Sequence, residues 1–191
     1  MATQRRMGSP DSATFNALLD ATERLLRNEG YGAASSRRVA EEAGLKQQLV
    51  YYYFRTMDEL LLACFQRRTA RALAKLEQDA ASEDPVKAIW NTLSNASDGK
   101  LSFEFMALAN HHDGIRAEVV RFVTASRRIQ TAAIARQREE QRTAPGPVSP
   151  AAAAFLLSAV SLMLGREAAT GIDEGHEDVR ALINSVLGQL D

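Results

Sequence analysis

Residues 34–60 read ASSRRVAEEAGLKQQLVYYYFRTMDEL, and this stretch decides the fold. A short helix is expected over 36–43, because apolar residues recur there at helical spacing and Gly44 follows them. Glycine adopts a positive φ without steric cost, so Gly44 suits a sharp turn. A second short helix is expected over 46–53, with apolar residues on its inner side. Two short helices joined at a glycine predict a helix-turn-helix, a motif that places its second helix in the major groove of DNA.

The polar side chains of this stretch suit DNA recognition. Glutamine can bond adenine through its amide and arginine can bond guanine at two acceptors, so Gln47, Gln48 and Arg37 are candidate base contacts. A free amide at a helix start binds phosphate, which makes Ser36 a candidate phosphate contact. Three tyrosines at 51–53 cannot all be buried on one short helix, and a phenol hydroxyl can donate to phosphate. The alternative interpretation is that the tyrosines only pack and the glutamines are only solvated.

Residues 14–65 resemble the N-terminal domain of the TetR family of bacterial regulators. The resemblance rests on residues spread over the whole motif, namely Ser35, Ser36, Val39, Ala40, Ala43, Gly44, Leu45, Val50, Tyr51, Tyr53, Phe54, Asp58, Glu59 and Leu60. It implies base contacts for one set of side chains, namely Arg37, Gln47, Gln48 and Tyr52. It implies phosphate contacts for a second set, namely Ser36, Tyr51, Tyr53 and Arg55.

Two residues depart from the family pattern. Lys46 stands where the family usually has Ser or Thr to cap the second helix, and Lys46 can itself contact phosphate. Met57 stands where the family usually has a lysine that touches phosphate. The resemblance further implies a homodimer on a palindromic double-stranded operator, and a repressor that a small hydrophobic effector releases from DNA. Activation in place of repression remains an alternative.

The whole chain is expected to be all-α. Its N-terminal three-helix domain, over 11–57, carries the helix-turn-helix, and a helical ligand-binding and dimerisation domain follows over 58–191. Apolar periodicity, glycine breaks and proline starts predict about nine helices. Their expected ranges are 12–29, 36–43, 46–53, 58–80, 85–96, 101–110, 115–141, 150–170 and 176–190.

The C-terminal two thirds are expected to hold a ligand pocket and a dimer interface. Small-molecule sites are mostly apolar with a few polar anchors. Residues of that composition on the middle helices are Trp90, Phe103, Glu104, Met106, Asn110, His111, Phe122, Arg127 and Met163. The last two helices are expected to pair with those of a second copy through Phe155, Ala159, Leu162, Met163, Val179, Ile183, Val186 and Leu187. The alternative for both sets is that they form the core of the monomer.

Charge and composition restrict the other classes. The net charge is −1, so the bulk charge does not support binding to phosphates. The single cysteine, Cys64, excludes an internal disulfide and a cysteine-based zinc cluster. No uninterrupted apolar run reaches about 18 residues, and the first ten residues lack the pattern of a signal peptide. We therefore expect a cytoplasmic protein that does not enter a membrane.

An enzyme is not expected. The sequence His111-His112-Asp113, together with Glu104, is the one cluster that resembles a metal or acid–base site. Adjacent helical residues point about 100° apart, so the two histidines cannot easily share a metal. We expect neither a metal nor a cofactor. A helical dimeric interaction protein that does not bind DNA remains the other alternative to a regulator.

Overall fold

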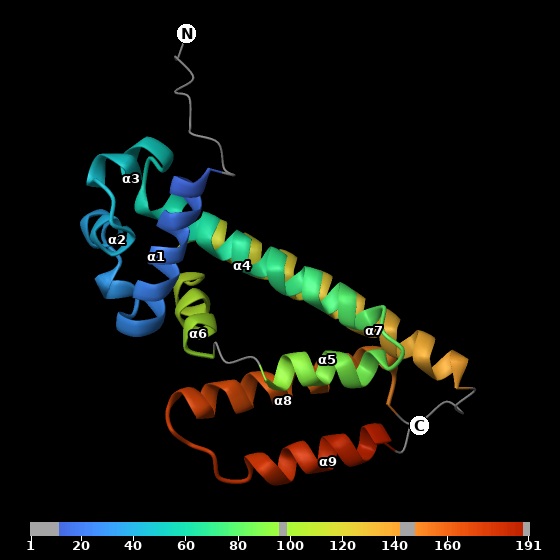
Figure 1. Ribbon diagram of the computed structural model, residues 1–191. Helices are drawn as coiled ribbons and strands as arrows, with labels where there is room; N and C mark the ends of the chain where they lie inside the picture. The colour runs from blue at the N-terminus through green and yellow to red at the C-terminus, as the bar shows by residue number, and fades with distance from the viewer. Residues whose placement is uncertain (1–11, 96–98, 142–147, 189–191) are drawn as a thin grey trace. The chain divides into compact units, whose positions relative to one another are not determined.

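The computed structural model describes residues 12–95, 99–141 and 148–188, and Figure 1 shows their helices in chain order. This part of the chain contains nine α-helices, one 3-10 turn at Tyr31–Ala33 and no strand, which confirms the all-α prediction. The helices are α1 (Ala13–Glu29), α2 (Ser36–Ala43), α3 (Gln47–Tyr53), α4 (Met57–Ala80), α5 (Pro85–Ser94), α6 (Gly99–Leu108), α7 (Asp113–Glu140), α8 (Pro150–Ala169) and α9 (His176–Gly188).

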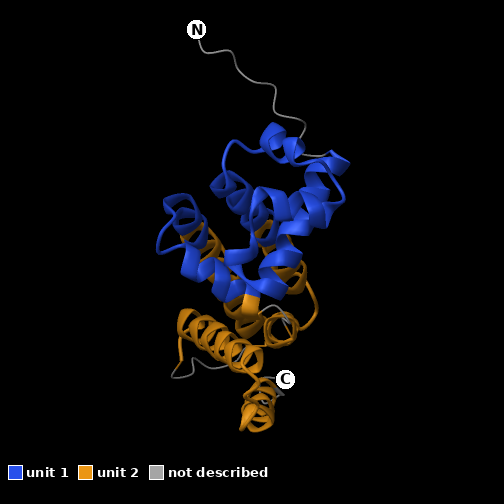
Figure 2. Cartoon of the chain, turned by 90° about the vertical axis from the view of Figure 1, so that its left-hand side faces the viewer, with its two compact units in different colours: residues 1–68, 101–119 blue, residues 69–100, 120–191 orange. Residues whose placement is uncertain are grey.

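The chain divides into two compact units, shown in different colours in Figure 2. Unit 1 holds residues 1–68 and 101–119, and unit 2 holds residues 69–100 and 120–191. The division falls inside α4 and α7, so the first half of α4 belongs with the N-terminal helices. The predicted boundary between residues 57 and 58 lies at the start of α4, whereas the division between the units falls after residue 68, inside α4. That 11–57 acts as a domain by itself stays a prediction.

Unit 1 is built around the apolar stripe of α1. Leu18, Leu26, Val39 and Leu61 are fully buried in one apolar cluster that joins α1, α2 and α4. Burying one such side chain contributes about 1.5–3 kcal/mol, so this cluster holds the N-terminal helices together. The start of α1 is capped by Ser12, whose hydroxyl accepts a hydrogen bond from the amide of the third residue of the helix.

One arginine ties α4 to α1 inside unit 1. The Arg67 Nη2 atom lies 2.7 Å from Oε1 of Glu23 and 2.7 Å from Oδ1 of Asp20. Its Nη1 atom donates to the backbone oxygen of Asn16 at 3.3 Å. The Arg67 side chain is only 12% exposed, so this contact is largely shielded from water.

Unit 2 packs α5, α8 and α9 around Trp90, and α7 joins them through the buried Ile134 and through polar contacts. The Trp90 indole is buried and its Nε1 donates to Oδ1 of Asn184 at 3.0 Å. On α7, Gln130 is buried with both ends of its amide satisfied. Its Nε2 donates to the Ser126 hydroxyl at 2.8 Å, and its Oε1 accepts from the Ser158 hydroxyl at 2.9 Å. This pairing fixes how α7 and α8 lie against each other.

Helix α8 is long and apolar for a helix of this chain. Its mean hydropathy over an 18-residue window is 1.4, so by length and composition it is a candidate membrane span. Only 22% of that window is buried in the described structure. Length and composition alone support a span, and the same apolar surface fits the dimer interface expected on this helix.

Candidate nucleic-acid interface

The turn between α2 and α3 has the geometry that the sequence predicts. Gly44 adopts φ 67° and ψ 30°, the left-handed conformation that glycine reaches without strain. The Gly44 amide donates to the Glu41 oxygen at 3.1 Å, and the Leu45 amide donates to the Ala40 oxygen at 2.9 Å. These two bonds form a Schellman motif, which satisfies the last carbonyls of α2 and turns the chain into α3.

Three of the predicted DNA-contacting residues meet across this turn. The Ser36 hydroxyl accepts a hydrogen bond from Nε2 of Gln47 at 2.9 Å and lies 2.8 Å from the Tyr51 hydroxyl. Ser36 is nearly buried, whereas Gln47 is exposed and Tyr51 is 53% exposed. We call this cluster the Ser36–Gln47–Tyr51 network. Through this network, Ser36 of α2 restrains the side chains of Gln47 and Tyr51 on α3.

Helix α2 begins at Ser36, the residue at which the sequence predicts its start. The capping side chain is that of Ser35, whose hydroxyl accepts from the Arg38 amide at 3.3 Å. Ser36 is the first helical residue, and the amides of a first helical turn have no partner within their own helix. The Ser36 amide therefore suits the proposed phosphate contact, while its hydroxyl serves the network.

The remaining tyrosines separate into an exposed and a buried one. Tyr52 is exposed on α3, as a base contact requires. Tyr53 is only 8% exposed and packs edge-on against Phe15 of α1, with ring centroids 5.9 Å apart. Its hydroxyl accepts from the Ser12 hydroxyl at 3.0 Å, which leaves the Tyr53 proton for another acceptor. Tyr53 thus joins the core with its ring and the start of α1 with its hydroxyl.

Most cations of this region are already paired with carboxylates. Arg24 pairs with Glu42 at 2.6 Å and Arg38 with Glu29 at 2.8 Å, both across α1 and α2. Arg37, exposed on α2, pairs with a glutamate one turn later, and that hydrogen bond and charge raise the pKa of Arg37. These ion pairs engage the guanidinium groups of Arg24, Arg37 and Arg38 with carboxylates of α1 and α2.

Two cations of the described motif form no ion pair. Among the described residues no ion pair involves the side chain of Lys46 or Arg55. Lys46 occupies the capping position of α3 without a side-chain hydrogen bond, as expected from the loss of Ser or Thr there. Gln48 is exposed next to it. Met57 packs partly buried against the core of unit 1, so the side chain that replaces the family's lysine serves packing.

The structure adds a feature that the sequence analysis missed. The Glu59 amide donates to the Thr56 hydroxyl at 3.1 Å, and the Glu59 carboxylate accepts from the Arg55 amide at 2.8 Å. This reciprocal capping fixes the backbone of Arg55 at the start of α4. The signal was present, since Thr56 and Glu59 have the spacing of a capping box.

The residues predicted for a ligand pocket are divided between the two units. Phe103, Glu104, Met106, Asn110 and His111 belong to unit 1, whereas Trp90, Phe122, Arg127 and Met163 belong to unit 2. The Glu104 carboxylate accepts from the Tyr31 amide at 3.0 Å, and Met106, Asn110 and His111 are exposed. Phe103 and Phe122 are half-buried. Their role in ligand binding stays a prediction.

The predicted dimer residues separate into two groups. Phe155, Ala159, Leu162 and Met163 of α8 and Val186 of α9 are exposed. Val179, Ile183 and Leu187 of α9 instead pack against the apolar cluster of α8 and α5. The exposed group is free to meet a second copy, and the other group matches the alternative of a monomer core.

The cluster considered for metal or acid–base chemistry is dispersed. Glu104 is held by the backbone at Tyr31, and His112 lies 3.3 Å from Asp58 through its Nδ1 atom. Within the described ranges, no group of three His, Cys, Asp or Glu residues could hold a metal ion.

Comparison with known proteins agrees with this geometry. Residues 18–64 match the family model described as bacterial regulatory proteins, tetR family. A fatty acid metabolism regulator protein of Bacillus subtilis is 21% identical over 73 residues, covering 38% of each chain. An HTH-type transcriptional regulator of Haemophilus influenzae is 34% identical over 68 residues, covering 36% of each chain. The chain therefore matches little more than a third of the length of these curated relatives.

Solved structures match over nearly the full length. The reduced form of Escherichia coli NemR has a TM-score of 0.76 at 18% identity, over 91% of this chain and 97% of that one. A TetR transcription regulator from Haloarcula marismortui has a TM-score of 0.74 at 20% identity, over 92% and 97%. At these identities the likeness shows that the fold is shared.

Proposed function

We propose that this chain, which belongs to the TetR family of bacterial regulatory proteins through its N-terminal domain, is a ligand-responsive DNA-binding transcription regulator. The relatives that match its N-terminal region are regulators, which supports this function over an enzymatic one. The observation that carries the proposal is the Ser36–Gln47–Tyr51 network behind the exposed side of α3. A cytoplasmic location is part of the proposal.

The network prepares Gln47 to read a base. One amide N–H of Gln47 is used by Ser36, which leaves the second N–H and Oε1 for a partner. Adenine offers a matching acceptor at N7 and donor at N6 in the major groove. Because Ser36 already holds the side chain, Gln47 loses less conformational freedom when it binds. Exposed neighbours on the same side, Arg37, Gln48 and Tyr52, are the further proposed base contacts.

The phosphate contacts in this proposal surround the same helix. They comprise the Ser36 amide, the hydroxyls of Tyr51 and Tyr53, and the side chains of Lys46 and Arg55. Hydroxyls and amides position the protein on the backbone of DNA without reading sequence. The Tyr53 hydroxyl keeps its own proton, and Lys46 and Arg55 are exposed, which supports these roles.

The protein acts as a homodimer in this proposal. Phe155, Leu162 and Met163 give α8 an exposed apolar surface, and Val186 extends it on α9. Covering such a surface with a second copy removes apolar area from water, and a two-fold axis pairs identical surfaces. Two recognition helices related by that axis bind a palindromic operator, with half-sites about one helical turn apart or a multiple of it.

Repression and release complete the proposed mechanism. A dimer on an operator that overlaps a promoter occludes transcription. Helix α4 belongs to both units, so an effector that binds unit 2 and shifts α4 can change the placement of the recognition helices. The effector must bind the released state more tightly than the DNA-bound state. An activator that uses the same DNA contacts is the alternative within this proposal.

Fluorescence anisotropy with DNA from upstream of the protein's own gene tests the proposal. We expect Gln47→Ala to relax base preference, with a loss of about 1–3 kcal/mol of discrimination for a bidentate contact. Tyr51→Phe should weaken specific and random DNA alike. Gln78→Ala, at an exposed glutamine on α4, is the control and should change neither. Equal losses on specific and random DNA for Gln47→Ala would contradict its role in base reading.

A helical dimeric interaction protein is the second candidate. The ion pairs of Arg24, Arg37 and Arg38 and the net charge of −1 favour it, because they reduce the attraction to phosphates. A folded dimer that binds neither its own upstream region nor the neighbouring promoters would favour this candidate.

A further inference from the structure

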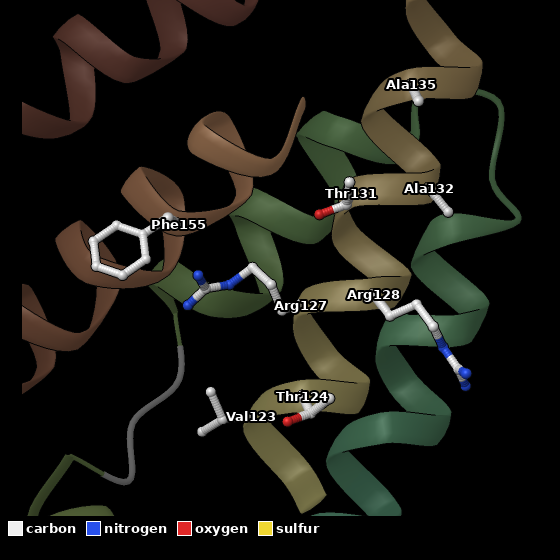
Figure 3. Close-up of a pocket in the computed structure, with 8 residues that line it drawn as sticks. All are labelled: Val123, Thr124, Arg127, Arg128, Thr131, Ala132, Ala135 and Phe155. Carbon is white, nitrogen blue, oxygen red and sulfur yellow. The ribbon is translucent and has the colours of Figure 1, made fainter. Parts of the chain in front are cut away.

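An open groove lies along α7 and is bordered by one residue of α8, all within unit 2 (Figure 3). Its volume is about 740 Å³. Small-molecule sites range over about 300–1,000 Å³, so this groove has room for an organic ligand. The lining residues are Val123, Thr124, Arg127, Arg128, Thr131, Ala132, Ala135 and Phe155. Of the residues predicted for a ligand pocket, Arg127 alone is among them.

Arg127 is held in a position to bind an anion. Its guanidinium carbon lies 4.7 Å from the centre of the Phe155 ring, and Figure 3 shows the side chain extending toward that ring. Stacking uses a face of the guanidinium, whereas its N–H donors point outward in its own plane. Within the described residues no hydrogen bond or ion pair engages Arg127. The planar fork is therefore half-buried, pre-oriented and available to a carboxylate or phosphate.

The rest of the groove favours an anion with an apolar body. None of its described lining residues is acidic, so no neighbouring carboxylate in the lining competes for Arg127. Arg128 adds a second positive charge, although it points away from Phe155 in Figure 3. Apolar and small side chains, including Val123 and Ala135, make up most of the other lining. A purely apolar ligand would leave the guanidinium without a partner, which costs binding energy.

We propose that this groove binds an amphipathic organic anion, whose acidic group is held in the plane of the Arg127 guanidinium while its apolar body lies along α7 and Phe155. This sharpens the expected hydrophobic effector into an anionic one and moves its site from the predicted pocket to the groove. The role as effector rests on the proposed function, whereas binding in the groove does not. Phe155 also belongs to the exposed surface proposed for the dimer, so ligand binding and dimer formation share a residue.

Calorimetric titration of the full chain with octanoate, octanol and octylamine tests the charge requirement. These probes share a chain and differ in the charge of the head group. We expect octanoate to bind at least about tenfold more tightly than octanol, the effect of one charge-assisted hydrogen bond, and octylamine not to bind. Octanol binding as tightly as octanoate would overturn the proposal.

Two matched variants locate the site. Arg127→Met keeps the aliphatic length and removes the guanidinium. It should weaken octanoate binding about tenfold or more and should not weaken octanol binding to that extent. Arg128→Met changes the net charge equally but alters a side chain that points away from Phe155, and it should weaken octanoate less than about threefold. Equal effects of the two variants would show a general charge effect and overturn the site.

The outcomes also separate the groove from other occupants and from the proposed function. If octanoate does not bind and Arg127→Met weakens dimer association in sedimentation, a second copy covers the groove and the proposal is overturned. Octanoate binding that leaves DNA affinity unchanged supports the groove and counts against its role as effector site. Absence of DNA binding without any ligand counts against the proposed function and leaves the groove standing if octanoate binds.

Discussion

The contact of Arg67 with α1 leads to a quantitative prediction about stability. The variant Arg67→Met keeps the aliphatic stem of the side chain and removes the guanidinium that lies 2.7 Å from Glu23 and 2.7 Å from Asp20. Burial lowers the pKa of Arg67, but the hydrogen bonds and charges of the two carboxylates outweigh this and raise it. The folded protein therefore holds the charged form, and the variant leaves the nearly buried Glu23 carboxylate without that partner.

The size of the loss follows from the burial of the pair. The side chains of Arg67 and Glu23 are 12% and 14% exposed, so water replaces the lost contact poorly. Breaking a buried ion pair on one side costs about 3–5 kcal/mol, and residual solvent access places this case near the lower end. The matched control is Arg38→Met, whose pair with Glu29 also joins two helices at 2.8 Å but is 47% and 43% exposed. Exposed pairs contribute about 0.2–1 kcal/mol.

Urea unfolding of the full chain, followed by circular dichroism and by tryptophan fluorescence, measures both variants. The only tryptophan, Trp90, lies in unit 2, so its fluorescence reports on that unit, while circular dichroism reports on all helices. Arg67→Met should lower the urea midpoint of the circular dichroism transition more than the urea midpoint of the fluorescence transition. Adding Glu23→Leu should recover part of the loss, because the unpaired carboxylate is removed with it. A loss for Arg67→Met no larger than that for Arg38→Met would refute the argument from burial.

Three further predictions follow from single side chains. Gly44→Ala should lower the free energy of unfolding by about 1–2 kcal/mol, because the backbone there has a positive φ. An added methyl group meets no atom within 4 Å at Gly44 or at Gly32, so Gly32→Ala, where φ is not positive, is the control and should cause no such loss. Chemical denaturation measures both variants. Leu162→Glu should convert the dimer to a monomer in analytical ultracentrifugation, whereas the control Val120→Glu, at a similarly exposed residue of α7, should leave the protein dimeric. If both variants stay dimeric, α8 does not form the dimer interface. Burial raises the pKa of the Cys64 thiol, so a disulfide reagent at pH 8 should label this thiol only after unfolding. Above a pH of about 8.5 the unfolded chain releases the thiol proton that the folded chain keeps, so the free energy of unfolding should fall as the pH rises past this value.

The features that the sequence predicts correctly are local ones. The turn at Gly44 and the start of α8 at Pro150 each depend on residues within one helical turn. Backbone conformation and capping are decided by such short-range contacts, so the residue types alone indicate them.

The features that the sequence does not predict depend on contacts between helices. Periodicity shows that α6 and α7 have apolar faces, but not which neighbour each face meets, so the nine residues predicted for one pocket fall into two units. Charge counting sees Arg24 and Arg38 as cations and cannot see their carboxylate partners on another helix. Tyr53 follows two exposed tyrosines, and only the packing of α1 against α3 shows that its ring is buried.

The pairing of the arginines on α1 and α2 has a consequence for how the protein holds DNA. A protein releases condensed counterions from DNA in proportion to the phosphates that its cations neutralise. Lys46 and Arg55 are the cations of the described motif that form no ion pair, so a dimer brings about four charges. The logarithm of its affinity for DNA should therefore fall with the logarithm of the salt concentration with a slope of about −3.6. The affinity of such a regulator for its operator falls less with rising salt than that of a strongly basic protein. Its association rate also gains less from long-range electrostatic attraction.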